Sequence, residues 1–248
     1  MADDPAEPKF KTGAVVILDA LGTKGIWNRS ETKSIIENWQ AVTDDFKVSL
    51  ADLHSDINRL KRVLQKNWVK IKNPDKPIFG ECKLKSFSDT IIITIESDSE
   101  HVCLYYLADF LRSPFCRAVI RNIFFRGVIS YGKYFQTNSL IIGPAVDEAA
   151  EWHPSADWIG ISAAPSVNFI LGYMFEQAID MKKSGDDSLF KIMGENKFFV
   201  RYNVPLRNGE YNSWALNWPI AMTNCGQNDG GSLMDPNSLV TLYKSFAQ

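Results

Sequence analysis

The sequence predicts an α/β (α+β) fold, because strand patterns and helix patterns alternate along the chain. Residues 13–18 form an apolar, β-branched stretch that ends at Asp19, and a second such stretch, residues 90–95, begins directly after Asp89. Between them, residues 31–67 contain no Gly or Pro and carry apolar residues at steps of three and four. That spacing predicts one long amphipathic helix, or two joined end to end, lying across a sheet or facing a partner.

The composition is that of an ordinary globular protein. With 248 residues, 45% of them hydrophobic and 23% charged, the chain is expected to form one domain, residues 13–248, after a flexible leader, residues 1–12. A net charge of −2 gives no general attraction for nucleic acid or an anionic membrane. No apolar run approaches the ~20 residues of a membrane-spanning helix, and the acidic N-terminus is unlike a signal peptide.

The cysteines and histidines point to a reducing compartment and away from a soft metal site. The four cysteines are scattered without a Cys-x-x-Cys pair, which is typical of reduced thiols in the cytoplasm. The three histidines lie far apart in the sequence, so a histidine-based metal site has no local support. We therefore expect a cytoplasmic protein whose metal ligands, if any, are oxygen atoms.

The middle of the chain predicts a hairpin followed by a helix. Residues 85–95 read as two strands that turn at Asp89, where the ordinary role of an acid is to form the turn. Ser97 and Glu100 have the spacing of a capping box, so a helix is expected from there to about Arg121. Pro114 is expected to interrupt this helix.

The rest of the chain is expected to alternate between short strands and helices, with Gly143-Pro144 marking a helix start. The expected strands are residues 123–134, 139–142, 158–161, 198–202 and 211–217. Further helices are expected at residues 163–181 and 239–246, and loops at residues 73–77 and 224–232.

Asp19 and Asp89 are the first candidates for chemistry. Each adjoins a buried strand, and two strands that deliver carboxylates to the same end of a sheet can hold hard divalent cations between them. The structural alternative is that Asp19 is a helix cap or turn residue and Asp89 a turn former. After Asp19, the amides of Leu21, Gly22 and Thr23 could approach a phosphate, because glycine lets the backbone come close.

The order of elements and four local motifs resemble class III nucleotidyl cyclases. Asp19-Ala20-Leu21-Gly22 matches the family's Asp-x-x-Gly metal motif. Lys85-Ser86-Phe87-Ser88-Asp89 matches its hairpin pattern Lys-x-x-Gly-Asp, with Ser88 where Gly is usual. Arg126-Gly127-Val128-Ile129-Ser130-Tyr131-Gly132 resembles its central strand, and Gly143-Pro144-Ala145-Val146-Asp147-Glu148-Ala149-Ala150-Glu151 resembles its helix motif Gly-x-x-Val-Asn-x-Ala-x-Arg. The resemblance covers about residues 13–160.

The resemblance implies a βαββαβ core with a mostly antiparallel sheet flanked by helices. It also implies a homodimer whose sites are shared across the interface, each with two divalent ions, Mn²⁺ or Mg²⁺. Asp19 and Asp89 would be the catalytic metal ligands, with the Ala20 carbonyl as a further ligand. Lys85 would contact the base, the alternative being an ordinary exposed strand lysine. Arg126 would balance charge near the metals or simply pair with a surface acid. Lys24 or Arg201 could pair with the terminal phosphates, although basic residues are more often solvated at the surface.

The departures from the family pattern concern the other half of the site. The transition-state Asn of the family falls on Asp147, its Arg on Glu151, and the Asp that helps to select adenine on Leu140. This combination resembles the pyrimidine cyclases of the Pycsar anti-phage systems. It implies conversion of UTP into 3′,5′-cyclic UMP and pyrophosphate as an antiviral second messenger, with Asp147 among the substrate-binding residues.

Other functions remain open at this point. A cytidylate cyclase or a purine cyclase would differ from a uridylate cyclase in the base that it accepts. Leu140 argues against adenine and does not distinguish the other bases. A catalytically silent nucleotide-binding dimerisation module would explain the acids at Asp147 and Glu151 but not the retention of Asp19 and Asp89. A polymerase-like palm also pairs acids on strands, but the chain offers no basic track for a nucleic-acid strand.

Overall fold

A computed structural model describes residues 9–23, 32–66, 80–185 and 198–222, with side chains in the second range described up to residue 53. In chain order the described elements are β1 (Lys11–Ala20), α1 (Thr32–Lys66), β2 (Cys82–Phe87), β3 (Thr90–Glu96), α2 (Glu100–Ile120), β4 (Phe125–Gln136), β5 (Ile141–Ile142), α3 (Pro144–Trp152), the 3₁₀ turn η2 (His153–Ser155), β6 (Gly160–Ala163), α4 (Pro165–Lys183), β7 (Phe199–Leu206) and β8 (Gly209–Leu216). No described helix is long and apolar enough to cross a bilayer.

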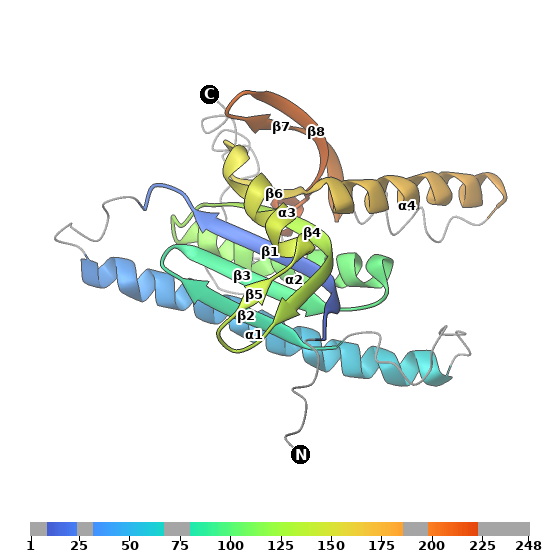
Figure 1. Cartoon of the computed structure of the whole chain (residues 1–248), viewed down its shortest axis with the longest axis horizontal. Coiled ribbons are helices and arrows are strands. Elements are labelled where there is room, and N and C mark those ends of the chain that lie inside the picture. The colour runs from blue at the N-terminus through green and yellow to red at the C-terminus, as the bar shows by residue number, and fades with distance from the viewer. Residues whose placement is uncertain (1–8, 24–31, 67–79, 186–197, 223–248) are drawn as a thin grey trace, which may run out of the picture.

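The strands form one sheet in the order β2-β3-β1-β4-β6-β8-β7, with β5 paired to β4 (Figure 1). Among the described strand pairs, β4–β6 is the parallel one, and the others are antiparallel. The first six elements follow one another as β1, α1, β2, β3, α2 and β4. The predicted fold, a βαββαβ core with a mostly antiparallel sheet flanked by helices, is therefore confirmed.

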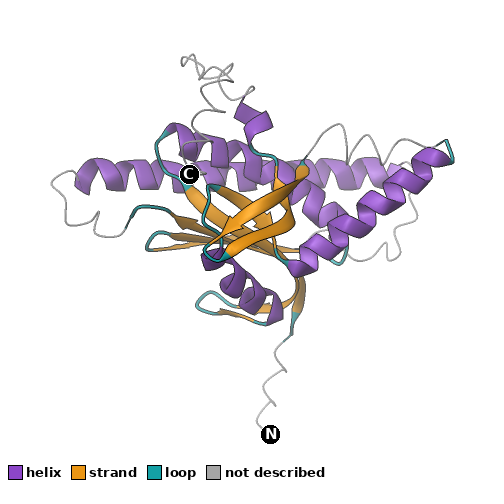
Figure 2. Ribbon diagram, turned by 90° about the horizontal axis from the view of Figure 1, so that it is seen from above, coloured by secondary structure: helices purple, strands orange, loops and turns teal. Residues whose placement is uncertain are grey.

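The two faces of the sheet are covered unequally, and β1 shows the division. Ala14, Val16 and Leu18 point into the larger core, where residues of α1, α2 and α4 pack against them. Val15 and Ile17 point to the other face, where they pack with Ala145 and Ala149 of α3. Figure 2 shows the sheet between the layer of long helices and the short helix α3. Asp19, two residues after Ile17, lies on the α3 side.

Helix α3 packs on β1, β4 and β5. On this side of the sheet, the part formed by β2 and β3 is therefore left more open. We call this part, with the adjoining end of β1, the open face. The register aligns Phe87, Thr90 and Asp19 in one row across β2, β3 and β1, and it aligns Lys85 with Ile92 in the next row. Phe87 is 83% exposed at the end of this face.

The long helix is confirmed: the expected span, residues 31–67, corresponds to α1. The expected break at Pro114 is wrong, because α2 continues through it. Pro114 lies among buried residues of the same helix, including Leu111 and Phe115, and their packing outweighs the loss of one backbone hydrogen bond. The expected capping box is also wrong. The N-cap is Ser99, and the Ser97 hydroxyl donates to the Ser99 carbonyl at 3.2 Å.

The remaining boundaries differ by a few residues from those expected. Strand β1 begins at Lys11, so it includes the last two residues of the expected leader. Strands expected at residues 123–134, 139–142, 158–161, 198–202 and 211–217 correspond to β4, β5, β6, β7 and β8, and the helix expected at residues 163–181 corresponds to α4. The loops expected at residues 73–77 and 224–232 and the helix at residues 239–246 lie outside the described residues.

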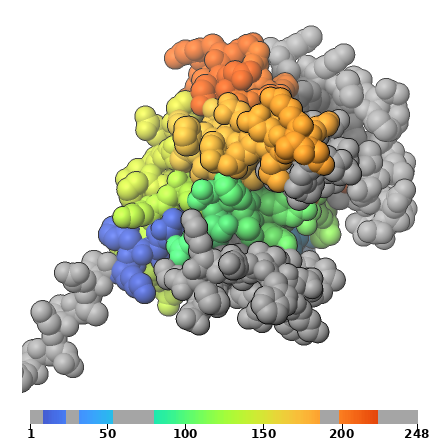
Figure 3. All heavy atoms as spheres, turned by 90° about the vertical axis from the view of Figure 1, so that its right-hand side faces the viewer, coloured from blue at the N-terminus to red at the C-terminus, as the bar shows by residue number. Residues whose placement is uncertain are grey.

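The C-terminal part extends the sheet beyond the βαββαβ core. Strand β8 continues the sheet from β6, and β7 follows it at the far edge. Figure 3 shows the β7–β8 hairpin above α4, which in turn lies over α2. The extension therefore stands away from the end of β1 and the β2–β3 turn, which carry the two candidate acids.

Candidate metal and nucleotide site

The fold brings Asp19 and Asp89 to the same end of the sheet. Asp19 lies opposite Thr90 of β3, and Asp89 precedes Thr90 in the β2–β3 turn. The Ala20 amide donates to the Asp89 carbonyl at 2.9 Å, which fixes the turn against the end of β1. The two candidate carboxylates and the Ala20 carbonyl, proposed as ligands from the sequence, are therefore neighbours in the structure.

The hydroxyl of Thr23 lies between two of these oxygen ligands. It donates to the Ala20 carbonyl at 3.2 Å, and it makes a short hydrogen bond to Oδ2 of Asp89. Gly22, at φ +75°, makes the turn that brings Thr23 back over the strand end. The Leu21 amide donates to the Phe124 carbonyl at 2.7 Å, so within the expected cradle the Gly22 and Thr23 amides are the better placed to receive a phosphate.

Arg126 provides a countercharge to Asp19. It lies directly opposite Asp19 on β4, and its Nε and Nη2 donate to Oδ2 of Asp19 at 3.0 and 2.8 Å. The side chains of Arg126 and Asp19 are only 16% and 17% exposed, so solvent screens this pair weakly. The other oxygen, Oδ1, accepts a long hydrogen bond of 3.4 Å from Thr90. Arg126 thus lies where charge balance at the metal site was expected.

His153 is a neighbour of this site that sequence reasoning did not identify. It begins η2, which packs against β1 and β4. Burial lowers the pKa of His153, and the negative charge of Asp19 partly opposes that effect. Its Nδ1 lies 3.1 Å from the Ala150 carbonyl. The sequence gives no indication of this position, because the three histidines are far apart along the chain. His153 comes near Asp19 only through the packing of η2 on β1 and β4.

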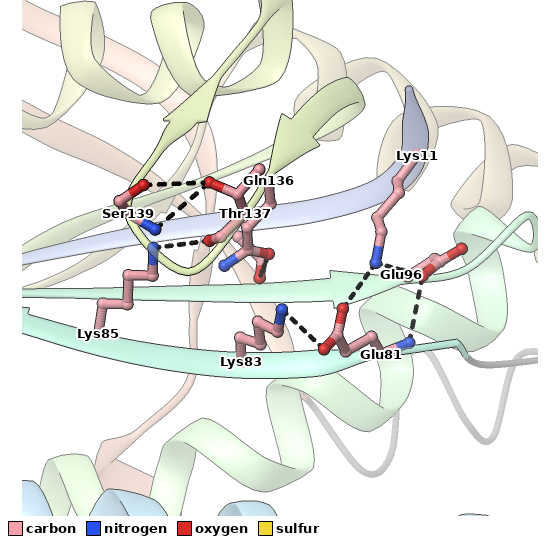
Figure 4. Close-up of polar contacts among 9 residues, drawn as sticks. Lys11, Glu81, Lys83, Lys85, Glu96, Gln136, Thr137 and Ser139 are labelled. Atoms are coloured by element: carbon pink, nitrogen blue, oxygen red, sulfur yellow. Dashed lines mark hydrogen bonds and ion pairs between the residues drawn. The ribbon is translucent and has the colours of Figure 1, made fainter. Parts of the chain in front are cut away.

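Lys85 lies on the open face beside the β4–β5 turn. Its Nζ donates to the Thr137 carbonyl at 3.0 Å (Figure 4). The same turn carries Leu140, which is 43% exposed and whose amide donates to the Thr137 hydroxyl at 3.1 Å. The fold therefore brings together the two positions that the resemblance associates with base recognition, although they are far apart in sequence.

The helix-motif acids have different surroundings. Asp147 and Glu151 are exposed on α3. Glu148 between them turns to the start of α4 and accepts hydrogen bonds from the Ser166 amide at 2.9 Å and the Ser166 hydroxyl at 2.5 Å. Glu148 is thus a structural acid that stabilises the N-terminus of α4. Asp147 and Glu151 remain available to a ligand or a second protomer.

Of the two further cations suggested for the phosphates, Arg201 does not join this group. Arg201 lies on β7, with its guanidinium 4.5 Å from the ring centre of Trp214 and Nη1 3.3 Å from Oδ1 of Asn168. Trp214 packs in the larger core, so Arg201 is on the opposite face of the sheet from Asp19. Lys24 lies outside the described residues.

The donor set fits hard divalent ions. Carboxylate and carbonyl oxygens are the ligands that Mg²⁺ and Mn²⁺ prefer, and Mg²⁺ commonly takes one or two protein carboxylates together with substrate phosphates and water. Within the described residues no group of three or more His, Cys, Asp and Glu side chains gathers as a metal cluster. Asp19, Asp89 and the Ala20 carbonyl would therefore hold ions only together with oxygens from a triphosphate.

No family model matches the chain, and no curated protein matches its sequence. Among solved structures, the chain is similar to the catalytic core of a rhodopsin-guanylyl cyclase with converted specificity in complex with ATPαS, at 13% identity and a TM-score of 0.43, covering 85% of this chain and 97% of that one. An adenylate/guanylate cyclase/hydrolase from Silicibacter pomeroyi aligns at 13% identity and a TM-score of 0.46, over 84% and 97%. The adenylyl cyclase CyaB from P. aeruginosa aligns at 10% identity and a TM-score of 0.43, over 85% and 95%. At these identities and TM-scores the likeness supports no conclusion about activity or substrate.

Proposed function

We propose that this protein is a nucleotidyl cyclase that converts a pyrimidine nucleoside triphosphate, with UTP as first choice, into the 3′,5′-cyclic monophosphate and pyrophosphate. The observation that carries the proposal is that Asp19, the Ala20 carbonyl and Asp89 lie at one end of the sheet, where the Thr23 hydroxyl bonds the Ala20 carbonyl and Asp89. An oxygen-only site beside a glycine turn suits a metal-bound triphosphate. A role of the product as an antiviral second messenger rests on the resemblance to Pycsar cyclases.

In the reaction, the ribose 3′-oxygen forms a bond to the α-phosphorus while the bond from that phosphorus to the bridging oxygen of pyrophosphate breaks, and the 3′-hydroxyl proton passes to solvent. Divalent ions, when bound, lower the pKa of the 3′-hydroxyl and neutralise the phosphate oxygens. Asp19 and Asp89 hold the ions, and the Gly22 and Thr23 amides receive the terminal phosphates. Arg126 keeps the charge at Asp19 balanced before substrate arrives.

The proposal includes a homodimer with two shared sites. In the resembled family, one protomer supplies the metal acids and the other supplies the residues that face the base and the helix motif. Lys85 and the exposed acid Asp147 would then act on a nucleotide bound to the metal acids of the partner. Leu140 in the adenine-selecting position supports a base other than adenine.

A product assay tests the proposal. Purified protein is incubated separately with UTP, CTP, ATP and GTP in Mn²⁺, and products are identified by mass spectrometry. Asp89→Ala is the inactive variant, and Asp180→Ala is the matched control, because Asp180 is an exposed acid on α4 that pairs with Lys183. A cyclic pyrimidine nucleotide from the parent and the control, but not from Asp89→Ala, is the expected result. Absence of cyclic product from a folded, dimeric parent would contradict it.

The second candidate is a nucleotide-binding dimerisation module without catalytic activity. The observation in its favour is that the positions of the family's transition-state Asn and Arg carry the exposed acids Asp147 and Glu151, which cannot replace those two groups, while the candidate metal ligands Asp19 and Asp89 are kept. Equilibrium binding distinguishes the two functions. Saturable, Mn²⁺-dependent binding of a nucleoside triphosphate that is recovered unchanged after prolonged incubation favours the module.

A further inference from the structure

A polar cluster on the open face has no role in the metal chemistry. It consists of Lys85 on β2, Thr94 on β3, Gln136 at the end of β4 and the backbone carbonyl of Thr137. Figure 4 labels Lys85, Gln136 and Thr137. Lys85, Thr94 and Gln136 come from three separate strands, so the cluster exists only because the β4–β5 turn folds back over β2 and β3. We call it the donor cluster, for the reason that follows.

The Gln136 carboxamide is held in one orientation. The Thr94 hydroxyl donates to Oε1 of Gln136 at 2.7 Å, and Thr94 is only 1% exposed. Because Oε1 accepts this hydrogen bond from Thr94, the two N–H donors of Nε2 are directed away from Thr94. Gln136 itself is half-buried, so this amine edge is accessible from the open face.

A buried phenol supports the same arrangement. Tyr134, on the same side of β4 as Gln136, is fully buried, and its hydroxyl makes no hydrogen bond of normal geometry to any described group. Burial raises the pKa of Tyr134, while the nearby Thr94 hydroxyl acts in the opposite direction. Thr94 therefore lies between a buried, uncommitted phenol and the Gln136 carboxamide. The Thr94 hydroxyl therefore has the Gln136 carboxamide, and not the Tyr134 phenol, as its hydrogen-bond partner.

The polar groups that the cluster presents are mainly donors. Lys85 offers an ammonium, and Gln136 offers two N–H groups. Of the two acids drawn in Figure 4, Glu81 is paired with Lys11 and Lys83, both at 2.7 Å, and Glu96 is paired with Lys11 at 3.0 Å. Leu140 adds an apolar side chain and no acceptor. A nucleobase that meets this surface gains hydrogen bonds from its carbonyl oxygens and meets repulsion at an exocyclic amine.

We infer that Gln136, oriented by Thr94 and assisted by Lys85, is a specificity-determining residue that selects a base with a carbonyl at its outer edge, and therefore uracil over cytosine. The inference rests on the proposed cyclase function and adds the base choice to it. Uracil carries an oxygen at position 4, where cytosine carries an amine. Against cytosine, the Nε2 donors would face a donor and remain unpaired, and the Lys85 ammonium, already bonded to the Thr137 carbonyl, would gain no acceptor; a recognition site penalises such a mismatch strongly.

The test compares UTP with CTP in variants that reverse the hydrogen-bonding character of position 136. Gln136→Glu replaces the donors by acceptors. Gln177→Glu, the same change at an exposed residue of α4, is the matched control. The measured quantity is the ratio of kcat/KM for UTP to kcat/KM for CTP in a competition assay. We expect the ratio to fall at least about tenfold in Gln136→Glu and to stay unchanged in Gln177→Glu. Thr94→Val, which frees the carboxamide, should lower it in the same direction.

The possible failures are distinguishable. If the parent makes a cyclic nucleotide and Gln136→Glu keeps the parent's base ratio, this inference is wrong and the cyclase function stands. If no nucleotide is cyclised, the cyclase function fails, and calorimetric dissociation constants of UTP and CTP for the same proteins decide the base choice. Tighter binding of UTP by the parent, lost in Gln136→Glu, supports the donor cluster without turnover. Equal affinity of the parent for the two nucleotides overturns it.

Discussion

The Asp19 carboxylate is paired with Arg126, and both side chains are largely withdrawn from solvent. Removing one partner of such a pair leaves an uncompensated charge. We therefore expect Arg126→Met to lower the free energy of unfolding by about 1–3 kcal/mol in metal-free buffer. A divalent ion at Asp19 would replace the lost countercharge, so Mn²⁺ should raise the melting temperature of the variant more than that of the parent.

The control for this prediction is the double variant Asp19→Asn/Arg126→Met. A neutral carboxamide needs no countercharge, so the additional response to Mn²⁺ should disappear. Melting curves of the three proteins with and without Mn²⁺ provide the measurement. If Arg126→Met were as stable as the parent without metal, the pair would not be the compensating contact that its geometry indicates.

Ser88 occupies the turn position where the resembled family has Gly, and it adopts φ +55°. A residue with a Cβ pays about 1–2 kcal/mol in this left-handed region. Ser88→Gly removes that cost but adds chain entropy to the unfolded state, so a net stabilisation of roughly 0.5 kcal/mol is expected. Ser88→Val should destabilise by more than 1 kcal/mol, roughly, because β-branched residues tolerate positive φ poorly. Urea denaturation of both variants tests the sign, and the opposite order would show that the serine side chain stabilises the turn.

At the scale of elements, the ends of β1, β2 and β3 opposite to the metal site are joined by ion pairs (Figure 4). Lys11 lies 2.7 Å from Glu81 and 3.0 Å from Glu96, and Lys83 lies 2.7 Å from Glu81. Hydrogen bonds from Lys11 and then Lys83 lower the pKa of Glu81. Burial lowers the pKa of Lys11, but its bonds to Glu81 and Glu96 outweigh this, so that pKa is raised.

These directions give a pH dependence with a definite sign. Because the pKa of Glu81 is lower in the folded state, its contribution is complete above the usual carboxyl pKa and is lost as the pH falls through the folded value. Glu81 is 46% exposed, so Glu81→Gln should cost only about 0.5–1 kcal/mol at pH 7. In urea denaturation, the difference between parent and Glu81→Gln should shrink as the pH falls below the usual carboxyl pKa and vanish once Glu81 is protonated in the folded state as well. A difference independent of pH would mean that packing, and not charge, is lost.

The elements predicted correctly from the sequence are those whose cause is local. The uninterrupted spacing of apolar residues in α1 is itself what makes an amphipathic helix, and Gly143, at φ +128°, starts α3 as expected. Local rules failed where packing decides the outcome, as at Pro114 inside the buried helix α2. They also failed at Ser97, whose hydroxyl bonds forward to Ser99 instead of capping the helix.

The candidate site was predictable in part for the same reason. Asp19 and Asp89 adjoin strand ends, so their meeting follows once their two strands pair. The ion pair with Arg126, the approach of His153 and the orientation of Gln136 by Thr94 all depend on long-range strand register and on helix packing. A single sequence holds no direct signal of that register. Arg201 is an example: the sequence suggested it as a phosphate partner, but its pairing with Trp214, which packs in the larger core, places it on the face of the sheet opposite to Asp19.

At the scale of the whole molecule, one face of the sheet is closed by three helices and the other only in part by α3. The open face ends at Phe87, 83% exposed, and beside it the β4–β5 hairpin exposes Leu140 and Ile142 at 43% and 45%. Exposed apolar side chains rimmed by charged ones are typical of protein–protein contacts. The proposed metal ligand Asp19 and the donor cluster lie on this same face, the arrangement that we expect for a site shared by two protomers.

A shared site predicts that two inactive variants restore each other. Asp89→Ala disables the metal acids and Lys85→Ala the base-facing side, and each should be inactive alone. In a mixed dimer, one site combines the acids of the Lys85→Ala protomer with the base-facing residues of the Asp89→Ala protomer, so it is intact. The other site carries both substitutions. Random exchange of equal amounts should restore about a quarter of the parent's activity. Adding Phe87→Asp to both variants should abolish the recovery if Phe87 lies in the contact, with the oligomeric state followed by light scattering. If the mixture stays inactive although mixed dimers form, each site lies within one protomer, and the shared arrangement is wrong.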